Sequence, residues 1–377
     1  MGAPIRIGID AHMVGGRETG NETYVLGIIE GLISLGDDSE LYVYHAGDVA
    51  HYPSPRVHPR RLLRGSPWTR LTVDLPVRSW SDHLDVMHTT YAAPVWSRCP
   101  VVLTVHDICY TSHPEWFSAR DLRVLSATVP WSIRRAARVI TVSDLCRTEI
   151  IERYRVPEEK VVRVYNAAGP AAQTLSEAEA RAEVTAIGID PSRPYVVAVG
   201  NLQPRKNLVR LIKAFAQLTA EGINSDLVIV GPEHFRSNLV REAATGLEAR
   251  VRMTGYLTHR QLAACYECAT VFAFPSLFEG FGIPALEAMA HGTPVVCARA
   301  GALPEVCGDA ALYFDPLDTE SIAATLRRIL TDSSLRAELS RAGRAREQRF
   351  SWRQSAKETL EVYRQAIGRH SLHGTAN

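Results

Sequence analysis

The chain has 377 residues, which exceeds the usual limit for a single hydrophobic core, so two domains are expected. The 42 basic and 41 acidic residues leave a formal charge of +1, and this balance argues against a nucleic-acid-binding protein. Seven scattered cysteines indicate a reducing compartment rather than a disulfide framework. Because neither a secretory signal nor a membrane-spanning run is evident, a cytoplasmic location is predicted.

The first half of the chain alternates apolar strand patterns with helical periodicity. Helical patterns cover residues 19–35, 118–137 and 144–154, the last with Ser143 as its N-cap. Because strands alternate with helices, they should form right-handed βαβ units and hence a parallel sheet. The predicted strands of this half are 5–10, 41–44, 86–88, 101–105, 139–142 and 161–165.

The second half repeats this alternation after a stretch rich in Ala, Gly and Pro. We therefore predict an α/β fold with two doubly wound Rossmann-like domains that face each other across a cleft. The predicted domains are 1–170 and 194–351, joined by a hinge at 171–193. The predicted strands of the second half are 195–199, 227–230, 251–253, 271–274, 295–297 and 311–314, and its clearest helices are 208–219, 319–330, 334–349 and 352–369.

A Gly-rich turn after the strand 271–274 leads into a helix that starts near Pro284 and ends at Gly292. Backbone N–H groups and the helix dipole converge at such a junction and favour an anion. Glu279 and Glu287, eight residues apart, must then bind something other than the anion, and sugar hydroxyls are the natural candidates. The combination indicates a sugar nucleotide. The alternative is that Glu279 merely complements the helix dipole and Glu287 is an exposed helix residue.

A second motif follows the strand 195–199, where Gly200 and Asn201 precede Arg205 and Lys206 at the start of a helix. The glycine permits close approach of the backbone, Arg can hold a phosphate through two hydrogen bonds, and Lys adds a mobile charge. Cations at a helix start oppose the helix dipole, so stability alone does not favour them. The phosphate-binding interpretation is preferred over a solvated basic turn.

Two other interpretations of the second half are weaker. Gly280-x-Gly282-x-x-Ala285 matches the dinucleotide fingerprint, but the next strand is not followed by the acidic residue that would hold a ribose. Cys265 and Cys268 have metal-ligand spacing without a second pair of ligands, so buried helical cysteines are preferred. No Asp-x-Asp occurs in the chain, and we predict no metal site: Arg205, Lys206 and backbone amides should meet the diphosphate charge.

The first half offers fewer signals. Gly15 and Gly16 follow its first strand, and their amides are candidates for the far side of a diphosphate, although an ordinary loop is nearly as good an explanation. His106 ends another strand, where it can bond a sugar hydroxyl or be held by local packing. The basic segment 60–70, or Trp131 with nearby arginines, is a candidate contact to anionic lipid, against the alternative of solvated arginines.

Together these motifs resemble the retaining glycosyltransferases of family 4, which have the two-domain GT-B fold. The residues that carry the resemblance are G-N-L-Q-P-R-K-N at 200–207, the Glu279 and Glu287 pair, and G-T-P-V-V at 292–296. The resemblance spans nearly the whole chain, and it implies that the last helix crosses back to the first domain. The sequence departs from the family pattern at Asn21 and Glu22.

The resemblance implies that Arg205 and Lys206 bind the donor diphosphate, Glu279 the sugar hydroxyls and Glu287 the ribose. It also places His106 beside the transferred sugar, Gly16 in a diphosphate-contacting loop, and 256–257 in the loop that contacts the base. The residues predicted to act in catalysis are His106, Arg205, Lys206 and Glu279, and those predicted to bind the donor are Gly15, Gly16, Gly200, Asn201, Tyr256, Leu257, Gly280, Phe281, Gly282 and Glu287.

The residues around His106 are similar to those of members that use GDP-mannose on polysaccharide or O-antigen intermediates. The resemblance therefore implies a retaining hexosyltransferase with mannose favoured and an acceptor that is a glycan or lipid-linked glycan. From the residues themselves we expect no cofactor other than the donor substrate, and a peripheral membrane contact through the basic segments of the first domain. The alternatives are transfer from a UDP-sugar, a GT-B epimerase or phosphorylase, and an inactive scaffold or regulator. The donor base, the acceptor and the oligomeric state are left open.

Overall fold

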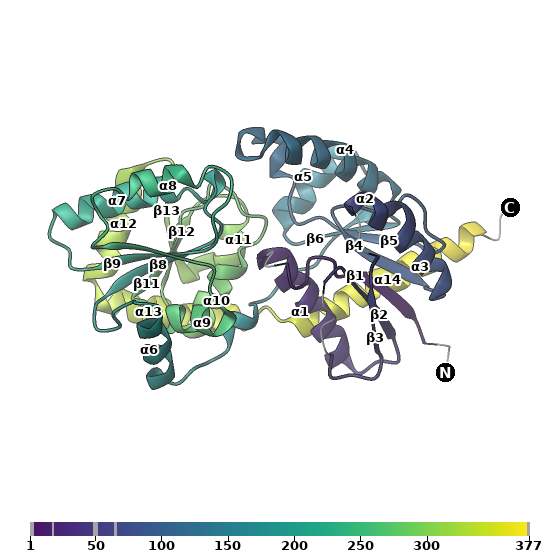
Figure 1. Cartoon of the computed structure of the whole chain (residues 1–377), viewed down its shortest axis with the longest axis horizontal. Coiled ribbons are helices and arrows are strands. Elements are labelled where there is room, and N and C mark those ends of the chain that lie inside the picture. The colour runs from purple at the N-terminus through teal and green to yellow at the C-terminus, as the bar shows by residue number, and fades with distance from the viewer. Residues whose placement is uncertain (1–3, 17–18, 48–51, 64–65, 375–377) are drawn as a thin grey trace. The chain divides into compact units, whose positions relative to one another are not determined.

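The computed structural model describes residues 4–16, 19–47, 52–63 and 66–374. The chain divides into two compact units, each built on its own sheet (Figure 1). Unit 1 comprises Met1–Ser112, Ala119–Asn166 and Ser351–Asn377, and unit 2 comprises His113–Ser118 and Ala167–Phe350. The segment 171–193, expected as a hinge, belongs to unit 2.

Unit 1 contains a seven-stranded parallel sheet in the order β3-β2-β1-β4-β5-β6-β7. The chain first runs outward from β1 to β3 and then returns to place β4 on the other side of β1, so that Ile9 is aligned with Val43 on one side and His88 on the other. This reversal is the mark of a doubly wound fold, and ligands bind beside it at the carboxyl ends of the strands. The strands are β1 (Arg6–Asp10), β2 (Glu40–His45), β3 (Val57–Arg61), β4 (Val86–Thr90), β5 (Val101–Thr104), β6 (Arg138–Thr141) and β7 (Val161–Arg163).

Helices cover both faces of this sheet. One core joins α1 and α14 to the sheet residues Ile7, Ile9 and Val86, and a second core packs Leu71 and Leu75 against the other face. The final helix therefore packs on the first unit, as the resemblance implies. The helices are α1 (Thr19–Leu35), α2 (Pro67–Thr69), the π-helical turn η1 (Arg70–Asp74), α3 (Leu75–Ser81), α4 (Ala119–Arg135), α5 (Asp144–Tyr154) and α14 (Trp352–Gly374).

The basic segment 60–70 is not a single loop. Arg60 and Arg61 end the strand β3, and the residues from Pro67 onward are helical as far as Ser81. The strand β3 was not predicted, because it contains Pro59 and proline argues against a strand. The proline is tolerated here because β3 is an edge strand, where its missing N–H is not needed by a neighbouring strand. Arg64 lies outside the described residues.

Two glycines let α1 and α14 approach closely. A Cβ on Gly27 would lie 2.3 Å from the ring of Trp352, and one on Gly31 would lie 2.3 Å from the backbone oxygen of Trp352. Since neither a ring packed between two helices nor a helix backbone can move by the ångström that a methyl group needs, α14 can take this position only if both residues are glycine.

We expect Gly27→Ala to lower the free energy of unfolding by about 1–3 kcal/mol, the usual cost of overpacking a core. Gly20→Ala in the same helix is the matched control, because a Cβ there meets nothing within 4 Å and the substitution should be neutral or stabilising. Thermal and urea unfolding of the two variants measures the difference. Equal stability of the two variants would contradict the close packing.

Unit 2 contains a six-stranded parallel sheet in the order β10-β9-β8-β11-β12-β13. Here the chain runs outward from β8 to β10 and returns to place β11 beside β8, so that Val196 is aligned with Val271. Both units therefore have the predicted doubly wound, Rossmann-like topology. The strands are β8 (Tyr195–Val199), β9 (Asp226–Val230), β10 (Val251–Gly255), β11 (Val271–Phe274), β12 (Val295–Ala298) and β13 (Ala311–Phe314).

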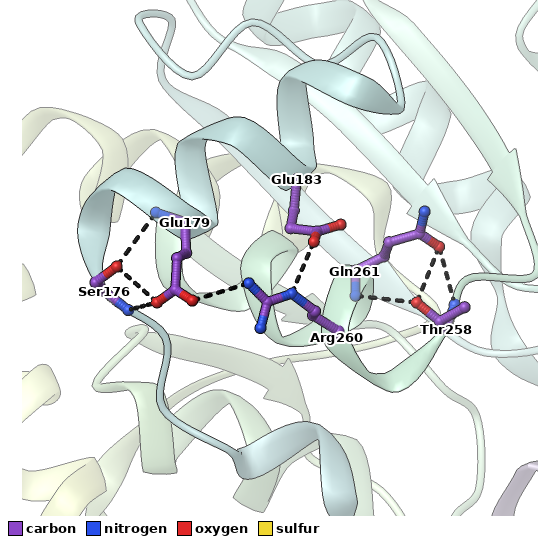
Figure 2. A network of polar contacts seen from close by, with 6 residues as sticks. All are labelled: Ser176, Glu179, Glu183, Thr258, Arg260 and Gln261. Atoms are coloured by element: carbon purple, nitrogen blue, oxygen red, sulfur yellow. Dashed lines mark hydrogen bonds and ion pairs between the residues drawn. The ribbon is translucent and has the colours of Figure 1, made fainter.

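The helices of unit 2 also lie on both faces of its sheet, with α7 on one side and α9 on the other (Figure 1). A polar network on the surface joins α6 to α9: Arg260 donates to Glu183 at 2.7 Å and to Glu179 at 3.0 Å (Figure 2). Glu179 also completes the capping box of Ser176. The same carboxylate therefore caps the N-terminus of α6 and binds Arg260 of α9. The helices are α6 (Glu177–Ala186), α7 (Leu208–Ala220), α8 (Asn238–Ala243), α9 (His259–Cys268), α10 (Ile283–His291), α11 (Leu303–Cys307), α12 (Thr319–Thr331) and α13 (Ser333–Glu347).

Candidate active site

The topology of unit 2 brings its two sequence motifs together. The strands β8 and β11 are neighbours at the point where the strand order reverses. The loop that follows β8 carries Gly200 and Lys206, and the loop that follows β11 carries Glu279 and Gly282. Because parallel strands end at the same edge of a sheet, these loops meet at the switch point of the fold.

Glu279 bridges the two predicted phosphate-binding cations. Its Oε1 accepts a hydrogen bond from Nζ of Lys206 at 2.7 Å, and its Oε2 accepts one from Nη1 of Arg205 at 3.1 Å. The same Arg205 nitrogen donates to the backbone oxygen of Phe278 at 2.9 Å. The three side chains, two from one loop and one from the other, therefore form a single charged cluster.

The backbone around this cluster is held by glycines and by one asparagine. Gly200 has φ +148°, and a Cβ on it would lie 2.9 Å from Cε of Lys206, so the glycine makes room for the lysine side chain. Gly301 has φ +55°, and a Cβ there would lie 2.5 Å from the backbone oxygen of Glu279. Asn207 ties the loops together, since its Nδ2 donates to the backbone oxygens of Pro275 at 3.0 Å and Pro316 at 2.7 Å.

Arg205 and Lys206 keep the carboxyl of Glu279 ionised. Burial by itself raises the pKa of this carboxyl, but the charges of Arg205 and then Lys206 outweigh it and lower the pKa to about 2. Glu279 is therefore ionised at neutral pH although it is only 7% exposed. The cluster is a triad of two cations and one anion with a net positive charge, which suits an anionic ligand that carries hydroxyl groups nearby.

Glu287 has the opposite electrostatics. It lies in α10, is 6% exposed, and accepts a hydrogen bond from the hydroxyl of Tyr266 at 3.1 Å. Burial raises its pKa to about 7, although hydrogen bonds from Tyr266 and the backbone of Gly169 oppose the shift. No cation contributes to this shift among the residues that the structure describes. A buried carboxyl with a strongly raised pKa is typical of a binding or reacting group rather than of a structural one.

Most of the other predicted donor-binding residues of unit 2 lie in the same loops, whereas Tyr256 and Leu257 follow β10, which β9 separates from β8. Gly282, with φ +114°, is the N-cap of α10, and the ring of Phe281 packs edge-to-face on Phe350 with centroids 5.7 Å apart. Oδ1 of Asn201 is buried and has no hydrogen-bond partner within the described ranges of the chain. The remaining members are Gly280 in the β11 loop, and Tyr256, which is 39% exposed, and Leu257 just after β10.

In unit 1, His106 lies two residues beyond the end of β5. Tyr24 contacts its ring edge-on with centroids 4.7 Å apart, and Nε2 of His106 is buried without a partner among the residues that the structure describes. Burial lowers the pKa of His106 to about 4, so the imidazole is neutral at pH 7. A neutral, unpaired and buried imidazole nitrogen can exchange one hydrogen bond with a ligand, but it cannot serve as a cation.

The loop with Gly15 and Gly16 differs from the expectation in one respect. The amide of Gly15 donates to Oε1 of Glu22 at 2.8 Å, and the amide of Gly16 donates to the backbone oxygen of Met13 at 3.0 Å. Contact with a diphosphate would require these bonds to be exchanged. Glu22, one of the two departures from the family pattern, thus fixes the loop, and the roles of Gly15 and Gly16 stay predictions.

Sequence reasoning missed two buried clusters beneath the carboxyl edge of the unit 1 sheet. Asp10, at the end of β1, is ion-paired with Arg70 and accepts a hydrogen bond from Nδ1 of His12 at 3.0 Å. Burial raises the pKa of Asp10, but the charge of Arg70 and the contacts of His12 outweigh this effect and lower the pKa to about 2. The position of Asp10 at a predicted strand end was a signal, but nothing in the sequence paired it with Arg70.

The second cluster is a chain of hydrogen bonds that starts under His106. The hydroxyl of Tyr24 bonds Oγ1 of Thr104 at 2.8 Å, Thr104 bonds Nε2 of His88 at 2.7 Å, and Nδ1 of His88 bonds the hydroxyl of Tyr363 at 2.6 Å. All four side chains are buried. The final helix is therefore linked through His88 and Thr104 to Tyr24, which packs against His106. The bond between His88 and Tyr363 joins residues that lie 275 positions apart in the sequence.

Across residues 4–16, 19–47, 52–63 and 66–374, no group of three or more His, Cys, Asp or Glu side chains is arranged to hold a metal ion. In the same part of the chain, no helix combines the length and the apolar character that crossing a membrane requires. Cys265 and Cys268 lie in α9, and burial raises the pKa of the Cys265 thiol to about 12.

Two parallel doubly wound units, the second with a charged cluster at its switch point, have the architecture of the GT-B fold. The family model for glycosyl transferases group 1 matches residues 180–346, and the model for glycosyltransferase family 4 matches residues 19–170. The chain belongs to glycosyltransferase family 4.

Similar proteins agree with this assignment. The O-antigen chain mannosyltransferase B of Escherichia coli is 32% identical over 266 residues, which is 70% of this chain and 70% of that protein. The structure of sucrose-phosphate synthase from Thermosynechococcus elongatus is 23% identical, with a TM-score of 0.77 over 97% of this chain and 100% of that one. HepE of Anabaena, solved with UDP and glucose, is 22% identical, with a TM-score of 0.72 over 95% of this chain and 99% of that one.

Proposed function

We propose that this glycosyltransferase is a retaining hexosyltransferase that moves mannose from a nucleotide sugar, with GDP-mannose favoured, to a glycan or lipid-linked acceptor of polysaccharide or O-antigen biosynthesis. The observation that carries the proposal is the cluster of Arg205, Lys206 and Glu279 at the switch point of unit 2. The choice of mannose is supported by the similarity to the O-antigen chain mannosyltransferase of Escherichia coli.

The donor diphosphate is proposed to bind Arg205 and Lys206. Arg205 has five N–H donors and Lys206 three, so each can bind a phosphate oxygen while it keeps its bond to Glu279. Glu279 thereby holds both cations in position before the reaction and presents its carboxylate to the sugar hydroxyls. Preorganised cations stabilise the charge that develops on the departing phosphate, which is the main electrostatic demand of glycosyl transfer. These cations take the place of a metal ion in the proposal.

Retention is proposed to proceed by attack on the same face of the sugar. The bond between the anomeric carbon and the leaving phosphate oxygen breaks, the acceptor oxygen bonds to that carbon on the same face, and its proton moves to the phosphate oxygen. Glu279 is a weak nucleophile because two cations hold its charge and its pKa is about 2. A covalent sugar on any side chain, detected by mass spectrometry of the intact enzyme, would contradict this route.

The test is a panel of sugar nucleotides with mannose-terminated oligosaccharides as acceptors. GDP-mannose should give the fastest release of nucleoside diphosphate, a chelator should leave the rate unchanged, and NMR should find the α-configuration of the donor in the product. Faster release from a UDP-sugar would establish the alternative donor. No release from any donor would favour the scaffold or regulator.

Glu287 and the loop at Tyr256 and Leu257 are proposed to bind the ribose and the base, and His106 to bond a hydroxyl of the transferred sugar. His106 fits this role because it is neutral and its Nε2 is buried. We place the reaction in the cytoplasm, at the inner face of the membrane if the acceptor is linked to a lipid.

A further inference from the structure

One surface of unit 1 exposes an unusual number of large apolar side chains. Three of the six tryptophans of the chain lie there, and Trp68 and Trp80 are 58% and 61% exposed. A soluble protein rarely exposes several tryptophans in one region, and such patches mark contacts with other molecules. We call this surface the tryptophan face, and its residues are Leu63, Trp68, Val73, Val77, Trp80, Val95 and Trp96.

The tryptophan face is continuous. Val73, Val77 and Trp80 have helical spacing and thus follow one side of the segment formed by η1 and α3. The loop with Val95 and Trp96 is bound to this segment, because the amide of Val95 donates to the backbone oxygen of Leu71 at 2.9 Å. On the other flank, the amide of Leu63 donates to Oδ2 of Asp74 at 2.5 Å. The exposed side chains therefore belong to one surface.

The exposure does not come from a missing core. Leu71 and Leu75, on the opposite side of the same segment, are 7% and 0% exposed and pack in the second core of unit 1. The segment is thus apolar on both sides, with one side buried and the other in contact with solvent. Folding of unit 1 explains the first side only.

Arginines surround the tryptophan face. Arg61 and Arg98 are exposed at its two flanks, and Arg78 in α3 donates to the backbone oxygen of Arg61 at 3.3 Å. The one acidic residue within the segment, Asp74, is 3% exposed and lies 3.5 Å from Nε of Arg78. The acidic residues just beyond α3 have partners of their own, since Asp82 accepts a hydrogen bond from the hydroxyl of Tyr44 at 2.9 Å and Asp85 one from the amide of Arg6 at 2.8 Å. The exposed arginines at the flanks complement anionic headgroups.

We infer that the tryptophan face docks unit 1 on a lipid surface that carries anionic headgroups. Tryptophan prefers the boundary between water and hydrocarbon, and arginines on an amphipathic segment add attraction to anionic lipid. The inference goes beyond the transfer reaction, and its test needs neither donor nor acceptor, so it can fail while the proposed function holds.

The other basic candidate, the helix α4, carries one exposed tryptophan. Trp131 in α4 is 39% exposed, but it is an isolated aromatic whose ring lies 5.4 Å from the guanidinium of Arg135, and Arg138 nearby is only 4% exposed. Trp131 is therefore the matched control: it is the same residue type, exposed on the same unit, and outside the tryptophan face.

The experiment is co-sedimentation with vesicles of phosphatidylcholine alone or with about 30% phosphatidylglycerol. The wild-type chain should bind the anionic vesicles, and binding should weaken as the salt concentration rises. The double variant Trp80→Ser with Trp96→Ser should lose at least about 10-fold in partitioning, since each ring removes roughly 1.5–3 kcal/mol of apolar burial. Trp131→Ser should bind as the wild type does, and circular dichroism should confirm that all variants fold.

Three outcomes would overturn the inference: no binding of the wild type to anionic vesicles, equal losses in the two tryptophan variants, or equal binding to neutral vesicles. A fourth outcome is a wild-type dimer in sedimentation equilibrium that the double variant converts to a monomer, with no vesicle binding. That result would replace the lipid surface by a second copy of this chain.

Discussion

Lys206→Ala should lower kcat for donor turnover by about 10²–10³-fold, which is the usual loss when one preorganised donor to a developing anion is removed. Nζ of Lys206 lies 2.7 Å from Glu279 and is one of two cations at the switch point of unit 2. Because the phosphate gains charge as the glycosidic bond breaks, kcat should fall more than the Michaelis constant for the donor rises. Steady-state release of nucleoside diphosphate measures both constants.

The matched control for this variant is Lys213→Ala, which removes an exposed lysine from α7 in the same unit. It should leave both kinetic constants unchanged. Glu279 keeps Arg205 as a partner at 3.1 Å in the Lys206 variant, so circular dichroism should show a folded protein. A Lys206 variant with near-normal kcat would mean that this side chain does not stabilise the leaving group.

Glu287→Gln should stabilise the protein above pH 7 by about 3 kcal/mol, since the raised pKa makes ionisation of this carboxyl costly and about 1.4 kcal/mol corresponds to each unit. The pKa of Glu287 rises from an ordinary value of 4.5 to about 7 because the group is buried. Below pH 4.5 this carboxyl is protonated in both the folded and the unfolded chain, so it does not reduce the free energy of unfolding. As the pH rises from 4.5 through 7, the unfolded chain loses the proton more readily than the folded one, and the free energy of unfolding falls. The glutamine has no such dependence, so the two proteins should be equally stable near pH 4.

Thermal unfolding of both proteins between pH 4 and pH 9 checks this prediction. Glutamine has the shape of glutamic acid and can still accept the hydrogen bond from Tyr266, so the substitution creates no cavity. If Glu287→Gln is less stable than the wild type at pH 8, the carboxylate is ionised and well solvated in the folded protein, and the raised pKa is wrong.

The same substitution should weaken the donor site. A carboxylate can accept hydrogen bonds from two ribose hydroxyls, whereas the amide offers one oxygen and a competing donor. Loss of one hydrogen bond to a charged group should raise the Michaelis constant for the donor by about 10–100-fold with a smaller change in kcat. A gain in stability together with a loss of binding is the expected sign of a residue kept for function.

Much of unit 2 was predictable from the sequence. The strands 195–199 and 271–274 match β8 and β11, and the helix that ends at Gly292 matches α10, because apolar runs and glycine C-caps report local structure directly. The family and the GT-B fold were likewise predicted and confirmed. Unit 1 was less predictable: β3 contains Pro59, and the helical segment after Pro67 has apolar residues on both sides, so neither shows a regular period.

The sequence by itself determined the strand–helix alternation, the two loops that carry Arg205, Lys206 and Glu279, and the family. These features are local, because a loop motif and its flanking strand lie within a few residues of each other. Only the tertiary structure decided that Glu279 bridges both cations across 73 and 74 residues, that burial raises the pKa of Glu287, and that Tyr363 bonds His88. Strand order and burial depend on the packing of the whole unit, and the exposure of the tryptophan face depends on which side of its helical segment that packing covers.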